Sequence, residues 1–237
     1  MMPAYYYNDV YFASYILVII GAVISAIASL NVNGTFKRFS KVRSSRGLAA
    51  QDVAMMILNS AGIYDVRIET IRGKLTDHYD PRSKVLRLSE SVYGQTSVAA
   101  IGVAAHECGH AIQHKEAYAP LRLRSASVPV ANIGSKLSWP IVLLGIFLGM
   151  YGLAEIGVLL FIFVVLFQLI TLPVEFNASA RALKILETSN ILDTKELGGA
   201  KKVLSAAALT YVAALFASIL QLLRLLMIVQ GGNRRKR

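Results

Sequence analysis

Val10-Tyr-Phe-Ala-Ser-Tyr-Ile-Leu-Val-Ile-Ile-Gly-Ala-Val-Ile-Ser-Ala-Ile-Ala-Ser-Leu30 is a run of 21 residues without a charged side chain, and it decides the class of fold. An α-helix rises about 1.5 Å per residue, so a helix of this length crosses the roughly 30 Å hydrocarbon core of a bilayer. Over the whole chain of 237 residues, 55% are hydrophobic and only 16% are charged. A typical soluble domain has about 25% charged residues. The sequence therefore predicts an integral membrane protein.

A second apolar zone, 137–174, is interrupted at Gly152 and Glu155. This pattern predicts a hairpin of two helices, about 138–153 and 156–174. The first helix is short for a membrane span. The chain nevertheless returns to the side that it left, whether that helix spans or is partly re-entrant.

The last apolar zone, 203–229, contains one charge, Arg224, and predicts a fourth helix. If this helix spans the bilayer, the basic tail that ends at Arg237 lies outside, against the tendency of basic loops to stay inside. A helix along the membrane interface, with the tail near anionic headgroups, is the alternative. The predicted fold class is a mainly α membrane protein with about four transmembrane or membrane-associated helices and a small cytoplasmic α+β domain.

Positive charge predicts which side of the membrane each segment faces. The chain has 25 Lys and Arg against 14 Asp and Glu, a formal charge of +11. In a soluble protein this excess would suggest nucleic acid, but here positive loops beside apolar spans explain it, so we expect no nucleic-acid partner. Segment 31–137 has basic residues crowded at the exit of the first helix. We therefore expect 31–137 and 176–202 to be cytoplasmic and the N-terminus to be outside, with the lipid bilayer as a partner.

The segment between the first helix and the hairpin has the pattern of an ordinary folded domain. Apolar spacing predicts a helix over 47–62, alternation predicts strands over 66–71 and 84–88, and Ser97 is a suitable N-cap for a helix that continues to His114. Five segments are thus predicted along the chain. They are an N-terminal transmembrane helix (1–30), the cytoplasmic domain (31–137), a transmembrane hairpin (138–175), a cytoplasmic helix and loop (176–202), and a C-terminal hydrophobic helix with a basic tail (203–237).

The predicted helix that follows Ser97 contains the motif H-E-x-x-H as His106-Glu107-Cys108-Gly109-His110. Residues four apart lie on one face of a helix, so both histidines can bind one ion. Glu107 lies beside that face, where it can serve as general base and acid. A chance pentapeptide is the alternative, and the helical context favours the metal site. The chain has a single cysteine, which excludes a multi-cysteine zinc site, and Cys108 is interpreted as a buried packing residue.

A catalytic zinc needs a third protein ligand and an open fourth position. His114 is unsuitable, because on a continuous helix it is displaced from His106 by a rise of roughly 12 Å. Glu175 follows nineteen uncharged residues at the end of the hairpin, where an ionisable group is costly unless it is paired or bound to a cation. A pair with Arg181 or Lys184 is the alternative role. The expected ligands of a Zn²⁺ ion are therefore His106, His110 and Glu175.

With these residues in place, the chain resembles the YugP-like family of bacterial membrane zinc metallopeptidases. It is more distantly similar to the membrane gluzincins that include the HtpX and Ste24 proteases. The H-E-x-x-H motif, Glu175-Phe-Asn-Ala-Ser-Ala-Arg181 and the block from Leu75-Thr-Asp-His-Tyr-Asp-Pro81 to Leu86-Arg-Leu-Ser89 carry the resemblance, which covers nearly the whole chain. It implies a gluzincin-like cytoplasmic domain and an integral membrane zinc-dependent metalloendopeptidase that hydrolyses peptide bonds with a zinc-activated water. It also implies a multi-pass protein of the bacterial cell membrane, with the active site facing the cytoplasm.

In the wider gluzincin pattern, an Asp four residues after the glutamate ligand supports a zinc-bound histidine, and Ser179 occupies that position here. A hydroxyl can accept the same hydrogen bond but makes the histidine less basic than a carboxylate would. This departure supports an alternative function, a non-catalytic membrane scaffold or assembly factor that retains a zinc site.

Several residues are candidates for stabilising the oxyanion of the transition state. They are His78, Tyr79, Arg181 and Tyr211. His78 also lies in a segment whose composition is typical of a turn, and Tyr211 is also suited to packing in the last helix. The strand over 84–88 could bind a substrate chain if it forms the sheet edge beside the motif helix. We expect a peptide or membrane-protein substrate.

Overall fold

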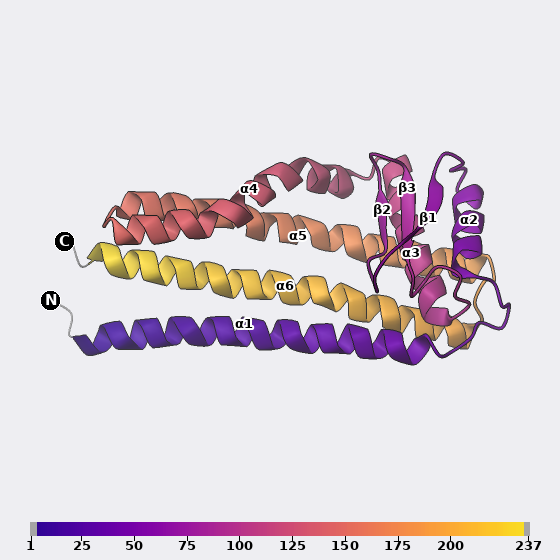
Figure 1. Ribbon diagram of the computed structural model, residues 1–237, viewed down its shortest axis with the longest axis horizontal. Coiled ribbons are helices and arrows are strands. Elements are labelled where there is room, and N and C mark those ends of the chain that lie inside the picture. Colours follow the sequence, from indigo (N-terminus) through magenta and orange to yellow (C-terminus); the bar gives the residue numbers. More distant parts are fainter. Residues whose placement is uncertain (1–3, 235–237) are drawn as a thin grey trace. The chain divides into compact units, whose positions relative to one another are not determined.

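The computed structural model describes the backbone of residues 4–234 and the side chains of residues 12 and 14–231. In chain order the elements are α1 (Ala4–Phe39), α2 (Ala50–Ser60), β1 (Arg67–Ile71), β2 (His78–Asp80), β3 (Val85–Ser89), α3 (Val98–Lys115), α4 (Ala119–Phe147), α5 (Tyr151–Thr188) and α6 (Thr194–Arg234) (Figure 1). The predicted fold class, mainly helical with a small α+β part, is confirmed.

Within residues 4–234, which the structure describes, four helices are long and apolar enough to cross a membrane. The candidate spans are Ser14–Phe39, Ala119–Phe147, Tyr151–Thr188 and Thr194–Gly231. The part of the basic tail beyond Arg234 lies outside the described residues.

The chain divides into two compact units. Among the described residues, the first unit comprises the chain up to Ala28, Leu123–Leu172 and the chain from Thr210 onward, and the second comprises Ser29–Arg122 and Pro173–Leu209. The first segment of the second unit ends at Arg122, earlier than residue 137, where the predicted cytoplasmic domain ends. The second unit also includes the segment Pro173–Leu209, which the predicted domain does not.

The turn between α4 and α5 lies earlier than the sequence predicted. It lies at 148–150, where Gly149 adopts a φ of +66°, a left-handed conformation that glycine enters without a steric penalty. The predicted break at Gly152 and Glu155 is therefore wrong, because both residues lie within α5. The prediction of a short first helix over 138–153 is also wrong, because α4 begins at Ala119 and continues through two prolines.

Glycines allow α4 and α5 to pack closely within the first unit. A Cβ atom on Gly145 would lie 2.5 Å from the backbone nitrogen of Ala154, and one on Gly157 would lie 2.8 Å from the carbonyl oxygen of Ser138. Small residues that permit such backbone contact are typical of helix pairs in membranes.

The second unit contains a three-stranded sheet with the order β1-β3-β2. β1 pairs with β3 in parallel and β2 pairs with β3 in antiparallel orientation. The sequence analysis placed β2 in the connection between two strands and therefore missed it. The condition under which the strand at 84–88 could bind a substrate chain is not met, because β3 is the central strand and not a sheet edge. The short strand β2 is instead the edge strand that contacts α3.

The sheet and helices of the second unit enclose a hydrophobic core. Leu86 and Leu88 of β3 are fully buried with Ile101 of α3 and Leu186 of α5. The predicted N-cap of α3 is confirmed, because the hydroxyl of Ser97 accepts a hydrogen bond from the backbone N–H of Ala100 at 3.3 Å. The core and this cap fix the position of α3 in the second unit.

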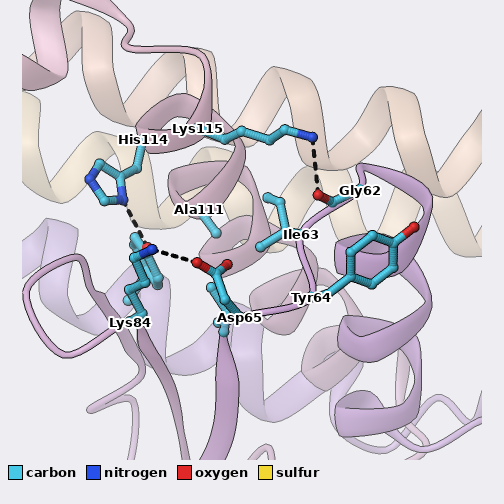
Figure 2. Close-up of a pocket in the computed structure, with 10 residues that line it drawn as sticks. Gly62, Ile63, Tyr64, Asp65, Lys84, Ala111, His114 and Lys115 are labelled. Carbon is cyan, nitrogen blue, oxygen red and sulfur yellow. Dashed lines mark hydrogen bonds and ion pairs between the residues drawn. The ribbon is translucent and has the colours of Figure 1, made fainter.

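An open pocket of about 500 Å³ lies beside the C-terminal half of α3 (Figure 2). Its charged side chains, its histidine and the hydroxyl of Tyr79 are paired with one another or with backbone. Lys84 pairs with Asp65, the amine of Lys115 donates to the carbonyl oxygen of Gly62 at 3.1 Å, and the hydroxyl of Tyr79 lies 2.9 Å from Nδ1 of His114. Because these groups already have partners, the pocket suits an uncharged group better than an ion.

Candidate metal centre

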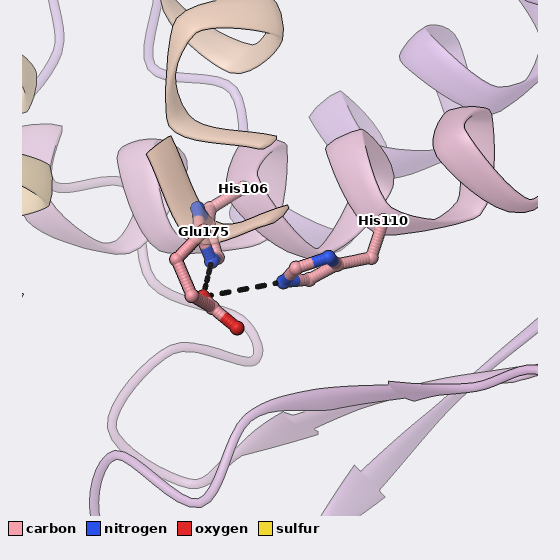
Figure 3. A group of neighbouring side chains, drawn as sticks. All are labelled: His106, His110 and Glu175. Atoms are coloured by element: carbon pink, nitrogen blue, oxygen red, sulfur yellow. Dashed lines mark ion pairs between the residues drawn. The ribbon is translucent and has the colours of Figure 1, made fainter. Parts of the chain in front are cut away.

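Three side chains of the second unit converge from two helices. His106 and His110 lie one turn apart on α3, and Glu175 lies on α5 (Figure 3). Oε2 of Glu175 is 3.3 Å from Nε2 of His106 and 3.5 Å from Nε2 of His110. The three side chains are 15%, 12% and 3% exposed in the order His106, His110, Glu175. One ligand atom from each residue lies within 4.8 Å of the others.

Gly109 explains how α5 approaches α3 closely enough to bring these atoms together. A Cβ atom at Gly109 would lie only 2.6 Å from the carbonyl oxygen of Ala178, so a larger residue would force the two helices apart. Ala178 follows Glu175 by about one helical turn and is fully buried. The glycine of the H-E-x-x-H motif therefore has a packing role beside the two histidines.

The donor set fits a tetrahedral metal ion. Zinc binds imidazole nitrogen and carboxylate oxygen at about 2.1 Å, so two of its tetrahedral ligands lie about 3.4 Å apart. The two distances from Glu175 Oε2, 3.3 Å to His106 and 3.5 Å to His110, match this value. Two imidazoles and one carboxylate also leave a fourth position for water or substrate, as in catalytic zinc sites.

The other ring nitrogen of each histidine, Nδ1, lies within hydrogen-bond distance of a neighbouring side chain. Nδ1 of His106 lies 3.1 Å from the hydroxyl of Ser179, and Nδ1 of His110 lies 3.0 Å from Oε1 of Gln113. These contacts orient both rings with Nε2 toward Glu175. Ser179 thus occupies the supporting position that the sequence analysis gave it.

The surroundings of the motif affect two ionisable groups. Burial alone would lower the pKa of His110, but the contact with Glu175 and the negative charge of Glu107 outweigh it, so the pKa is raised from its usual value. Burial raises the pKa of the Cys108 thiol well above its usual range, and its sulfur lies 3.5 Å from the carbonyl oxygen of Ala54. Cys108 is therefore a packing residue and a poor nucleophile.

Glu107 lies next to His106 on α3 and is 7% exposed. The negative charge of Glu107 acts on a second carboxyl group, that of Asp77. Burial raises the pKa of Asp77, and the negative charge of Glu107 raises this pKa further. The backbone N–H and the hydroxyl of Ser89 donate hydrogen bonds to the Asp77 carboxylate, and these bonds oppose the rise without cancelling it. The edge of the sheet therefore brings an acidic side chain into the electrostatic field of the motif.

The structure brings Arg181 near the histidine supports but gives it partners of its own. Its guanidinium donates to Oε2 of Glu116 at 2.6 Å and to Oδ1 of Asn177 at 2.7 Å. The alternative that Glu175 serves only as a helix-end partner of Arg181 is disfavoured, since Glu175 contacts both histidines.

Two other candidates for stabilising an oxyanion, His78 and Tyr79, have partners outside the three converging side chains. Nδ1 of His78 lies 2.9 Å from the carbonyl oxygen of Thr76, and its Nε2 lies 3.4 Å from the guanidinium of Arg87. His78 and Tyr79 are successive strand residues, so their side chains face opposite sides of the sheet. Tyr79 contacts His114 of α3, and Tyr211 belongs to the first unit.

Sequence reasoning missed Gln113, a fully buried residue three positions after His110. Its amide nitrogen lies 2.8 Å from the carbonyl oxygen of Val174 and 3.0 Å from Oδ1 of Asn177. The available signal was the spacing, because a residue at i+3 lies beside the ligand on the helix surface. A polar residue at that position in an apolar helix was a reason to look for a buried partner.

Comparisons with known proteins agree with this geometry. The chain is 48% identical, over 206 residues, to "Putative membrane protease YugP" of Bacillus subtilis (strain 168), which covers 87% of this chain and 92% of that protein. No solved structure matches the chain. The family described as "Putative neutral zinc metallopeptidase" matches residues 14–230. The match covers most of the chain, and the two histidines and the glutamate form a candidate site for a metal. This membrane protein therefore belongs to that zinc metallopeptidase family.

Proposed function

We propose that the protein is an integral membrane zinc-dependent metalloendopeptidase. In this proposal His106, His110 and Glu175 bind Zn²⁺, and Glu107 is the catalytic base and acid. The observation that carries the proposal is the convergence of the three ligand atoms from α3 and α5 at distances that suit one tetrahedral ion.

The identity of the metal rests on the donor set together with the family. Two imidazoles and a carboxylate suit zinc, and they also suit ferrous iron in certain oxygenases. Membership of a zinc metallopeptidase family favours zinc. When bound, zinc would supply a Lewis acid that polarises water and the peptide carbonyl group.

The side chains of the chain itself would then transfer the proton. Glu107 accepts a proton from the water that adds to the carbonyl carbon, and it later donates this proton to the amine nitrogen as the C–N bond breaks. Ser179 and Gln113 hold His106 and His110 in place during both steps.

We further propose that the site faces the cytoplasm and acts on membrane proteins or on segments that emerge from the membrane. Glu175 belongs to a helix that is itself a candidate span, so the site lies on the chain close to a membrane segment. The edge strand β2 contacts α3 and is suited to bind an extended substrate chain by strand addition.

Metal content and proteolysis of purified protein test the proposed chemistry. The wild type and Glu107→Gln are each expected to contain one zinc ion, because Glu107 is not a ligand, but only the wild type should cleave peptide bonds. Loss of the catalytic base is expected to slow cleavage by about 10²- to 10⁴-fold. Glu90→Gln, which alters an exposed glutamate, is the matched control and should remain active.

Two results would contradict the proposal. Iron in place of zinc would overturn the metal assignment, and zinc without cleavage in the wild type would favour the scaffold. The substrate class has a separate test with a peptide segment presented either free or fused to a membrane anchor. Faster cleavage of the anchored form is expected, whereas rapid cleavage of free unstructured chains alone would refute the membrane preference.

A further inference from the structure

A chain of hydrogen bonds leads from the surface of the second unit to His110. Arg181 pairs with Glu116 at 2.6 Å and donates to Oδ1 of Asn177 at 2.7 Å. The same Oδ1 lies 3.0 Å from the amide nitrogen of Gln113, and Oε1 of Gln113 lies 3.0 Å from Nδ1 of His110. All of these residues belong to the second unit.

The donor and acceptor in each bond follow from the chemistry of Arg181. A guanidinium can only donate, so the Asn177 atom that faces Arg181 must be the carbonyl oxygen. Gln113 contacts this same oxygen and also contacts the carbonyl oxygen of Val174 at 2.8 Å. Both atoms can only accept, so Gln113 must present its NH₂ group to them.

The orientation of Gln113 then determines the protonation of His110. With its NH₂ group committed to two acceptors, Gln113 can present only its carbonyl oxygen to Nδ1 of His110. A carbonyl oxygen accepts, so Nδ1 must carry the proton. In a neutral imidazole the lone pair is then on Nε2, the nitrogen that lies 3.5 Å from Oε2 of Glu175.

Burial makes this arrangement selective. Gln113 is fully buried, so water does not replace a lost partner, and an unmatched polar atom at this position carries the full desolvation penalty. The Arg181–Glu116 pair is partly exposed, with side-chain exposures of 25% and 52%. The buried end of the network therefore determines the tautomer, and the exposed pair anchors it.

We propose that Gln113 is a positioning residue that fixes His110 as the Nδ1-protonated tautomer, so that the lone pair of Nε2 points into the metal centre, and that Asn177 and Arg181 fix the orientation of Gln113. This inference rests on the proposed function, because it assigns a ligand role to His110. Its consequence is that amide nitrogen and oxygen are not interchangeable at position 113.

Two substitutions of the same kind should give opposite results. Gln113→Glu replaces the NH₂ group by an oxygen. This oxygen would face the carbonyl oxygen of Val174 and Oδ1 of Asn177, and none of the three atoms carries a proton to donate, so they would repel one another. Asn177→Asp keeps the oxygen that accepts from Arg181 and Gln113, so both of those bonds survive. Each substitution adds one negative charge near the metal centre, and such a charge on its own would strengthen the binding of a cation.

The test measures the zinc affinity of the purified full-length wild type, Gln113→Glu and Asn177→Asp by competition with a coloured chelator. Loss of a ligand's hydrogen-bond support typically weakens metal binding 10- to 100-fold. We expect a loss of this size for Gln113→Glu, because repulsion from the two acceptors turns its carboxylate away from Nδ1 of His110. For Asn177→Asp we expect an affinity within about threefold of the wild type, or higher. The visible absorption spectrum of bound Co²⁺ should change in Gln113→Glu and stay unchanged in Asn177→Asp.

A Gln113→Glu variant with wild-type affinity and spectrum would overturn the inference, and so would an equal loss in both variants. If Gln113→Glu does not fold, Gln113→Met provides the same test, because it removes the acceptor without adding a charge and should also weaken zinc binding. A wild type that binds zinc without cleaving peptides would refute the proposed catalysis and leave this test valid. If the wild type binds no metal, the proposed function fails, and ¹⁵N NMR of His110 at about pH 8.5 decides the tautomer, with Nδ1–H expected in the wild type and in Asn177→Asp but not in Gln113→Met.

Discussion

The two histidines of the metal centre have similar rings but different supports. Ser179 contacts Nδ1 of His106 through a hydroxyl, and Gln113 contacts Nδ1 of His110 through an amide. Neither support is a carboxylate, the partner that most increases the basicity of a metal-bound imidazole. This chain therefore orients the two proposed ligands with neutral groups, and the negative charge at the proposed metal centre comes from Glu175 and Glu107.

Substitution of Ser179 tests the support of His106. Ser179→Ala removes the hydrogen-bonding group 3.1 Å from Nδ1, so we expect zinc affinity to fall by about 10- to 100-fold. Ser179→Asp restores an acceptor and should recover at least the wild-type affinity. Chelator competition measures both, and Ser127→Ala, whose hydroxyl bonds only to the backbone of its own helix, is the control. An unchanged affinity in Ser179→Ala would show that the contact has no function in metal binding.

The raised pKa of His110 predicts how metal binding depends on pH. A metal ion binds only the neutral imidazole, so protons compete with zinc below the pKa of the metal-free protein. Because that pKa lies above the usual value of about 6.5, zinc affinity should begin to decline at a higher pH than it would with an unperturbed histidine. Zinc titrations between about pH 6 and pH 8.5 measure the effect. An affinity that stays constant down to pH 6 would contradict the predicted direction of the shift.

At the scale of single residues, the sequence predicted the face of α3 and the glutamate that meets it. Spacing supplied His106 and His110, and the energetic penalty of a carboxylate at the end of an apolar run supplied Glu175. Gln113 was not predicted, because the value of a buried amide depends on partners from α5 that spacing along α3 does not reveal.

At the scale of elements, the contact between α3 and α5 controls the metal centre. Gly109→Ala would place a Cβ atom 2.6 Å from the carbonyl oxygen of Ala178, and helix separation is the expected response. We expect a destabilisation of about 1–3 kcal/mol and a marked loss of zinc affinity, because Glu175 moves with α5. Thermal unfolding and zinc titration measure the two effects.

Gly198→Ala is the matched control for this variant. Gly198 is an exposed helical glycine of the same unit, and no atom lies within 4 Å of an added Cβ, so alanine there should leave zinc affinity unchanged and raise stability by roughly 0.5–1 kcal/mol. A Gly109→Ala protein that binds zinc like the wild type would show that the two helices adjust without disturbing the ligands.

The errors in element boundaries have a physical cause. The hairpin contains two glycines three residues apart, Gly149 and Gly152, and hydropathy alone does not decide which of them enters the left-handed conformation. The start of α4 was missed because its first half contains basic residues and prolines, which weaken the apolar signal without breaking the helix. The three-residue strand β2 was missed because its pairing with β3 is a long-range property of the sheet.

At the scale of the whole molecule, the predicted orientation in the membrane can be tested with single cysteines. Tyr64 is 80% exposed in the second unit, and Met150 is 55% exposed at the turn between α4 and α5. If the second unit is cytoplasmic, Tyr64→Cys in intact cells should be protected from a membrane-impermeant thiol reagent, and Met150→Cys should react. The unmodified chain is the control, because its only cysteine, Cys108, is fully buried. The reverse labelling pattern would invert the orientation.

The family, the membrane character and the division into helices and a small sheet could all be expected from sequence. Long uncharged runs and the motif on α3 are local signals that single segments carry. The division into two units was not predicted, because each unit combines segments that are far apart in the chain.

The wide separation of the ligands along the chain has a consequence for biosynthesis. Glu175 is synthesised 65 residues after His110, with α4 and most of the apolar part of α5 between them. At about 5–20 residues per second, a ribosome needs roughly 3–13 s to cover this interval. During that time the nascent polypeptide contains both histidines of the proposed metal centre but not its glutamate. Under the proposed function, a truncated product that lacks α5 lacks this glutamate as well and should bind zinc weakly and cleave no peptide bonds.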